Sequence, residues 1–146
     1  MRHRGGRSAA AVTLTAGIAA VLLLAGCDTR PREIPPLRQW TDDMAFRITS
    51  EPSPPRARER TVYKVVVRDK ESGQPIEGAE GRIFATSRDR ASTWDALVAG
   101  PELGSYYGTL KFITAGEWAV AIQFRRDSTK KLERMDWVQE VRAARP

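Results

Sequence analysis

The sequence predicts an all-β protein, a small antiparallel β-sandwich that follows a signal helix and a proline-containing tether. Three observations support this fold class. From Met44 onward, apolar residues recur with a period of two rather than 3.6, as expected for half-buried strands. The predicted strands are short, and Gly or Pro turns separate them. Removal of residues 1–26 leaves 120 residues, which is enough for one domain of ordinary size.

The N-terminus has the two parts of an export signal. It opens with MRHRGGR, a basic stretch without acidic residues, and continues as an apolar run from Ala9 to Ala25. A charged start followed by an apolar segment is typical of a secretory signal peptide. We therefore predict that residues 1–26 are a signal peptide that is removed from the mature protein.

Cys27 is the predicted site of lipidation. Together with the preceding Leu24, Ala25 and Gly26, it resembles the lipobox of bacterial lipoproteins. The resemblance implies diacylglycerol on the Cys27 thiol and cleavage of the chain directly before it. Two or three acyl chains make a stable anchor, whereas one binds only reversibly. The alternative is an uncleaved signal anchor, but the apolar run is shorter than the roughly 20 residues that span a bilayer.

The lipid anchor predicts an extracytoplasmic, membrane-anchored protein. Asp28 directly follows the cysteine. In enteric-type bacteria an acidic residue at this position resembles a signal for retention at the inner membrane. Asp28 therefore favours the inner membrane, while the outer membrane and a Gram-positive surface stay open as alternatives.

Residues 27–42 are predicted to be the lipidated cysteine and a tether. Three prolines lie among charged residues, and the apolar residues do not alternate. Prolines extend a chain toward polyproline II, with a rise of about 3.1 Å per residue. Such a tether could hold the domain up to roughly 45 Å from the lipid. The sandwich domain is then expected over residues 43–146.

The first half of the domain predicts three strands. The first covers 44–48, where apolar and polar residues alternate until prolines interrupt the pattern. The second covers 61–69, and its inward face carries Tyr63, Val65 and Val67. A turn is expected over 71–75, because Gly73 can adopt positive φ. The third strand is expected over 80–85.

The second half predicts three more strands. The fourth covers 106–113, and a turn over 114–116 leads into the fifth. The fifth strand has the clearest alternation, with an inward face formed by Trp118, Val120, Ile122 and Phe124. A polar hairpin tip over 126–130 leads to the sixth strand, over 132–141.

The connection over 86–104 predicts a short helix. Ser92 and Asp95 have the spacing of a capping box, and Gly100 would end the helix. Three apolar residues would share one face of this helix: Trp94, Leu97 and Val98.

This connection has two interpretations. In the first it crosses one end of the sandwich, and Trp94 anchors it to the core. In the second it is a binding loop with Arg88, Arg90 and Trp94 as its contact residues, because long connections on a rigid scaffold often carry function.

Four segments of the domain also resemble a known family pattern. They are VVVRD at 65–69, GQPIEGA at 73–79, GSY at 104–106 and GEW at 116–118. Their order and spacing resemble the YtkA-like and FixH-like families, small exported domains with an immunoglobulin-like β-sandwich. The resemblance covers roughly 44–125. It implies a membrane-associated accessory or binding domain, in some members linked to copper handling or cytochrome oxidase assembly, and it does not imply an enzyme.

The copper implication depends on the donors present. The single histidine, His3, lies in the signal peptide, and the lipid occupies the Cys27 thiol. Met44 and Met135 are the soft donors that stay in the mature chain, and they could approach each other if the first and last strands pair. Both fall on the inward phase of their strands, where methionine fills gaps in a core. We therefore expect no metal site, and no cofactor beyond the covalent lipid.

Catalytic residues are not expected either. The mature chain lacks histidine and a free thiol, so the usual general bases and thiol nucleophiles are missing. Asp42 and Asp43 form an acidic pair that is interpreted as a solvated domain boundary.

The net charge of the mature chain and the placement of its basic residues indicate which class of partner to expect. The mature chain carries a net charge of +3, which is too low for a nucleic-acid-binding footprint. Basic residues gather in the last hairpin, at Arg125, Arg126, Lys130 and Lys131. They could contact anionic headgroups, or they could be solvated and discourage edge-to-edge pairing. We expect a lipid-anchored, non-enzymatic binding module with two partners, the membrane and an unidentified membrane or envelope protein.

Overall fold

The computed structural model describes residues 34–146, which form an all-β unit. This confirms the predicted fold class. The signal peptide over 1–26, the lipobox, Cys27 and Asp28 lie outside the described residues, so the predictions made for them are not tested. Within 34–146 no helix is long and apolar enough to cross a membrane.

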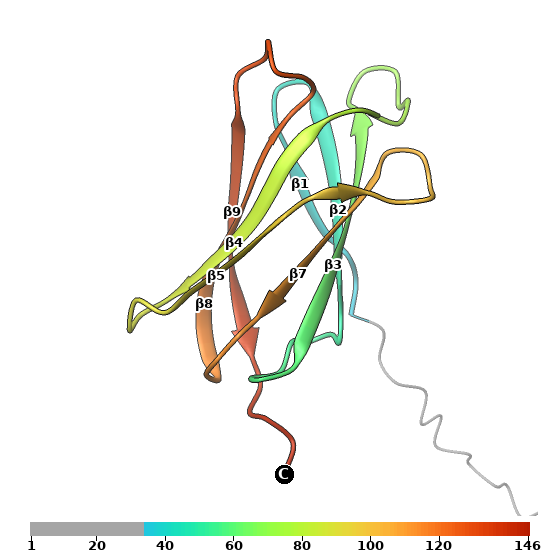
Figure 1. Ribbon diagram of the computed structural model, residues 1–146. Coiled ribbons are helices and arrows are strands. Elements are labelled where there is room, and N and C mark those ends of the chain that lie inside the picture. Colours follow the sequence, from blue (N-terminus) through green and yellow to red (C-terminus); the bar gives the residue numbers. More distant parts are fainter. Residues whose placement is uncertain (1–33) are drawn as a thin grey trace, which may run out of the picture. The chain divides into compact units, whose positions relative to one another are not determined.

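Two antiparallel sheets make up the sandwich (Figure 1). The five-stranded sheet has the order β1-β2-β3-β7-β6, with these bounds: Leu37–Trp40, Met44–Glu51, Arg60–Asp69, Ser105–Lys111 and Val98–Ala99. The four-stranded sheet has the order β5-β4-β8-β9, with these bounds: Ser92–Ala96, Glu80–Ser87, Gly116–Arg125 and Glu133–Val141. All six strands predicted from the sequence are present, within a few residues of their expected ends.

The core lies between the two sheets and consists of the predicted inward faces. The residues of β2, β3 and β8 with the expected inward phase are at most 3% exposed: Met44, Phe46, Ile48, Tyr63, Val65, Val67, Trp118, Val120, Ile122 and Phe124. Aromatic rings connect the sheets, because Phe124 packs edge-on against Phe46 at 5.4 Å and against Tyr106 at 5.2 Å between centroids. Such pairs add specificity to the burial of apolar area.

The predicted helix within 86–104 is wrong. Residues Ser92–Ala96 form β5, which pairs with β4 so that Trp94 lies opposite Phe84. Asp95 does not cap a helix; its carboxylate accepts a hydrogen bond from the Thr109 backbone N–H at 2.7 Å. Pairing with β4 satisfies the backbone of these residues, and this tertiary context overrides a weak local helix signal.

The predicted tether is too long at its C-terminal end. Leu37–Trp40 form β1, with Leu37 opposite Ile48, so the sandwich begins before residue 43. Leu37 is half-buried and packs against the core. The strand is a short edge strand with a single core residue, and four residues alternate too briefly to be recognised in the sequence.

The turn predicted over 71–75 is confirmed. Gly73 has a φ of +73°, and the Asp69 carboxylate accepts hydrogen bonds from the Glu71 and Ser72 backbone N–H groups at 3.1 and 2.7 Å. Gly104 also has a φ of +73°, and a Cβ there would lie 2.7 Å from the Val67 carbonyl oxygen. Both positions therefore favour glycine.

The connections divide between the two ends of the sandwich (Figure 1). The β1–β2, β3–β4 and β8–β9 connections lie at one end. The β2–β3, β4–β5 and β7–β8 connections lie at the other end, where the chain also enters β1.

Candidate functional site

A groove of about 520 Å³ lies over the outer face of β1, β2 and β3. Its volume is within the range of natural ligand sites. We call it the cationic groove, and its lining residues are Pro36, Arg38, Trp40, Ala45, Phe46, Arg47, Thr49, Lys64, Val66, Arg68 and Glu102.

The period of two places the cations of the cationic groove on one face. On β3, the inward phase supplies the core, so Lys64, Val66 and Arg68 point outward. Arg47 is the outward residue of β2 that lies opposite Val66. Arg38 of β1 lies directly opposite Arg47. Arg47 therefore has Arg38 as its cross-strand neighbour and two further cations as its diagonal neighbours.

One acidic side chain lines the cationic groove. Glu102 forms an ion pair with Lys64, and the hydrogen bond from Lys64 lowers the pKa of the Glu102 carboxyl and raises the pKa of Lys64. Arg68 donates a hydrogen bond to the Gly73 carbonyl oxygen at 3.0 Å. Arg38 and Arg47 form no ion pair with any residue of 34–146. The groove thus keeps a net positive charge.

Apolar surface accompanies these cations. The Trp40 side chain is 58% exposed and borders the groove next to Ala45, while Val66 lies between Lys64 and Arg68 on β3. Indole rings bind well at interfaces because they combine a large apolar face with a polar edge. Chemically, this arrangement can hold several anionic groups beside an apolar one.

Sequence reasoning missed the cationic groove. It used the alternation within 44–48 and 61–69 to find the core and did not examine the opposite phase. That phase carries Arg47 in one strand and Lys64 with Arg68 in the next. Arg38 could not be placed, because β1 had been assigned to the tether.

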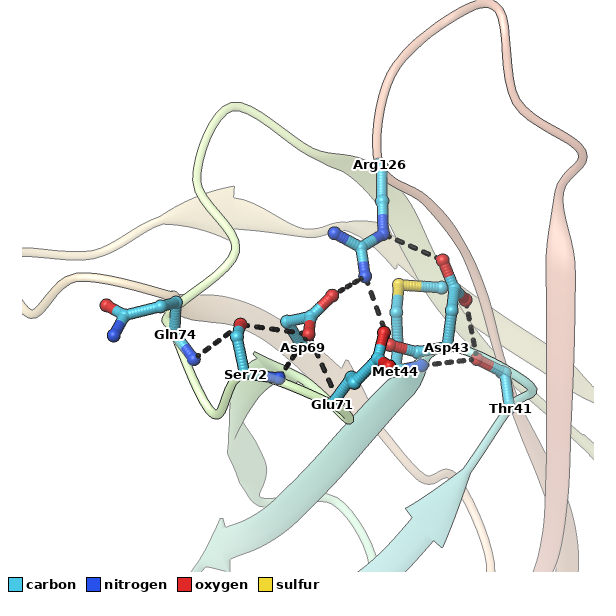
Figure 2. Close-up of polar contacts among 8 residues, drawn as sticks. All are labelled: Thr41, Asp43, Met44, Asp69, Glu71, Ser72, Gln74 and Arg126. Atoms are coloured by element: carbon cyan, nitrogen blue, oxygen red, sulfur yellow. Dashed lines mark hydrogen bonds and ion pairs between the residues drawn. The ribbon is translucent and has the colours of Figure 1, made fainter.

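Two arginines of the predicted basic hairpin are paired with carboxylates. Arg125 donates to the Glu80 carboxylate through Nε and Nη2, at 2.8 and 2.6 Å. Arg126 donates through Nε to the Asp43 carboxylate at 2.8 Å and through Nη2 to the Asp69 carboxylate (Figure 2). Both guanidinium groups are thus already paired with carboxylates of this chain.

We call Arg126, Asp43 and Asp69 the Arg126 clamp. Figure 2 shows the Arg126 side chain between the two carboxylates. A backbone hydrogen bond from Ser72 and the bond from Arg126 hold the pKa of Asp69 well below its usual range, and Asp69 in turn raises the pKa of Arg126. The clamp joins the β8–β9 connection of the four-stranded sheet to the β1–β2 connection and to the C-terminal end of β3 in the five-stranded sheet. Asp43 is therefore part of an ion pair, which corrects its interpretation as a merely solvated boundary residue.

The predicted loop residues lie along the β4–β5 hairpin. Arg88 is 3.7 Å from the Glu117 carboxylate, and Arg90 occupies a turn position with a φ of +64°. Trp94 is 69% exposed on the outer face of β5. It does not anchor the connection to the core, so that prediction is wrong. Leu97, which is 7% exposed, contributes to the core instead.

The two candidate copper donors are core residues. Met44 is 2% exposed and Met135 is 4% exposed, as their inward phase predicts. β2 and β9 belong to different sheets, so the strand pairing that could have brought these methionines together does not occur. In the described part of the chain, no three His, Cys, Asp or Glu side chains gather in a way that could hold a metal ion.

Two buried hydroxyl groups lie beneath the five-stranded sheet. The Thr61 and Tyr63 oxygens have no hydrogen-bond partner among the residues that the structure describes. Burial raises the pKa of Tyr63, so its phenol stays protonated. Its ring packs against Trp137 at 6.3 Å between centroids. Both hydroxyls belong to the buried core.

Comparison with known proteins finds a similarity in fold alone. No family model and no curated protein matches this chain. The sandwich is similar to the crystal structure of a DUF4426 family protein from Pseudomonas aeruginosa PAO1, with a TM-score of 0.59 and 14% sequence identity. The similarity covers 75% of this chain and 97% of that chain. At this identity it shows the β-sandwich fold alone.

Proposed function

We propose that this protein is a lipid-anchored, non-enzymatic, extracytoplasmic binding module that presents its cationic groove to a membrane-associated partner protein. The observation that carries the proposal is the groove itself. Arg38 and Arg47 face each other on an exposed sheet surface, and no described carboxylate neutralises them. Unpaired cations beside an exposed tryptophan are typical of a recognition surface.

The predicted address supports a partner at a membrane. The lipobox over 24–27 would place the mature N-terminus at the lipid surface. Since β1 begins at Leu37, about nine residues separate Cys27 from the sandwich. In the polyproline II conformation, that segment would reach roughly 28 Å at about 3.1 Å per residue. The sandwich would therefore stay close to membrane proteins, and the YtkA-like and FixH-like resemblance agrees with such a role.

The residue content of the sandwich supports binding rather than catalysis. The single histidine and the single cysteine of the chain are at positions 3 and 27, so residues 34–146 contain neither. Recognition by charge and shape requires neither residue type, whereas most acid–base and thiol chemistry does. No specific observation favours the copper-handling alternative, because Met44 and Met135 are buried.

The experiment is crosslinking of the full-length, C-terminally tagged chain in its native membranes, followed by affinity purification. Two variants serve as controls: Cys27→Ser, which removes the lipid site, and the double variant Arg38→Ala/Arg47→Ala. We expect one membrane-associated protein to be recovered with the wild type and lost with both variants. Recovery of the same proteins from the wild type and both variants would contradict the proposal, as would catalytic turnover by the purified chain.

A further inference from the structure

We infer that the occupant of the cationic groove is an extended segment of the partner that carries carboxylates at alternating positions. This inference rests on the proposed function and names the chemistry that the groove would recognise. It follows from the spacing of the cations, from the lack of a counterion to Arg38 and Arg47 among the described residues, and from the residues at the border of the groove.

Spacing favours an extended peptide. Arg47 has Arg38 directly opposite and Lys64 and Arg68 at the two diagonal positions. Opposite positions of an antiparallel pair lie about 5 Å apart, and diagonal positions about 7 to 8 Å apart. Every second side chain of an extended segment points the same way, at intervals of about 6.6 Å. Carboxylates at alternating positions therefore match the separation between neighbouring cations.

Charge requires an anionic occupant. Like charges directly opposite each other on a sheet are destabilising, yet Arg38 and Arg47 occupy such positions. In this region Glu102 is the one acidic lining residue, and it pairs with Lys64 at the border. An anion placed between the two arginines would offset their repulsion. Because Lys64 is already paired with Glu102, the occupant would make its specific ionic contacts with Arg38, Arg47 and Arg68.

Neither chain segment that flanks the sandwich suits the groove by its charge. Residues 28–33 contain two acidic and two basic residues, and residues 142–146 contain arginines and no acid. Neither segment brings net negative charge to the groove. A flat layer of headgroups would first meet cations that project from a connection, such as Lys130 and Lys131 in the β8–β9 connection, rather than cations inside a groove.

The apolar border adds a second requirement. Trp40 is exposed beside the groove at the C-terminal end of β1, and Pro36 lines the groove just before the N-terminal end of β1. A ring or an aliphatic side chain beside the carboxylates could pack on the Trp40 indole. The segment is therefore acidic and also amphipathic, with carboxylates over the arginines and an apolar residue at one end.

The test is a titration of the lipidated full-length protein in phosphatidylcholine nanodiscs with a fluorescent peptide of four Glu-Ser repeats, read by anisotropy. A peptide of four Gln-Ser repeats is the neutral control. Arg38→Ala/Arg47→Ala is the groove variant, and Lys130→Ala/Lys131→Ala is the matched variant with the same change of charge. Thermal unfolding of each variant verifies that it is folded.

We expect the groove variant to weaken acidic-peptide binding roughly tenfold or more and the matched variant to weaken it less than about twofold. Equal weakening by both variants would overturn the inference, as would equal binding of the neutral peptide. Stronger competition by glycerophosphoglycerol, a lipid headgroup, than by the unlabelled acidic peptide would overturn it in favour of a lipid. If the peptide fails while the crosslinked partner still depends on Arg38 and Arg47, this inference fails and the proposed function stands; if both fail, the proposed function fails as well.

Discussion

The two basic regions of this protein differ in what surrounds their cations. In the β8–β9 hairpin, Arg125 and Arg126 pair with carboxylates from other strands and connections. In the cationic groove, Arg38 and Arg47 face each other with no described carboxylate between them. The hairpin is conspicuous in the sequence, whereas the groove becomes visible once the strands are paired.

This difference separates a structural role from a binding role. Arg125 holds a carboxylate of the neighbouring strand β4, and Arg126 holds two carboxylates of the other sheet, so both contribute to the integrity of the sandwich. Arginines that repel each other on an exposed face contribute nothing comparable, so a ligand is the simplest reason for them. We therefore propose that the absence of described counterions, rather than local charge density, marks the binding surface of this protein.

The largest expected effect comes from the core beneath both regions. Phe124 precedes the hairpin arginines and packs against Phe46, which lies between Ala45 and Arg47 of the groove strand. We expect Phe124→Ala to lower the free energy of unfolding by about 3 to 5 kcal/mol, since the ring is fully buried. Urea unfolding measures this loss. A loss below about 1 kcal/mol would show that the two regions do not share this support.

The Arg126 clamp is expected to give the next largest effect. Arg126→Ala removes bonds to Asp43 and Asp69 and should lower Tm by a few degrees, because it disconnects the β8–β9 connection from the other sheet. Lys130→Ala, in the same connection, is the matched control and should leave Tm nearly unchanged. Equal Tm values for the two variants would contradict the structural role of Arg126.

The clamp should also make stability depend on pH. The pKa of Asp69 is lowered in the folded protein, mainly by the Ser72 backbone bond and by Arg126, whereas an unfolded Asp titrates at about 3.9. Its contribution is therefore complete above that value and is lost as the pH falls through the lower, folded pKa. We expect the stability gap between wild type and Asp69→Asn to be present at pH 7 and to narrow below about pH 4. A gap that stays constant down to pH 2 would exclude Asp69 as the cause.

The smallest effect on stability is expected in the groove. Arg47→Thr removes the repulsion with Arg38 and keeps a residue suited to a strand, so the free energy of unfolding should stay unchanged or rise by at most about 0.5 kcal/mol. Any gain should shrink in high salt, because screening weakens the repulsion. Denaturant unfolding at low and high salt measures both. A loss above about 1 kcal/mol would assign Arg47 a structural role like that of Arg126.

Most of the fold could be predicted because alternation reports burial directly. The strands that supply the core, such as β3 and β8, carry apolar residues at most of their inward positions. β1 and β5 were missed for a common reason, since each is a short edge strand with at most one apolar residue on its inward phase. Their identity depends on the strands beside them, and β5 in particular pairs with β4 despite a local capping pattern.

The cationic groove was harder to predict than the fold. Its cations come from three strands, and their proximity depends on the register that places Arg38 opposite Arg47 and Arg47 opposite Val66. The pairing of the hairpin arginines likewise depends on contacts between residues far apart in the chain, such as Arg126 and Asp43. Composition and spacing do not contain this information. Examination of the outward phase of the predicted strands would have revealed part of the cationic groove, namely Arg47, Lys64 and Arg68.

Site-specific photo-crosslinking in living cells tests the central claim most directly. A photo-reactive amino acid replaces Val66, on the floor of the cationic groove, or Val138, which is 68% exposed on the outer face of the other sheet. We predict a crosslink to a membrane-associated protein from position 66 and none from position 138. A crosslink from position 138 alone would contradict the account, because it would place the partner on the sheet opposite the groove.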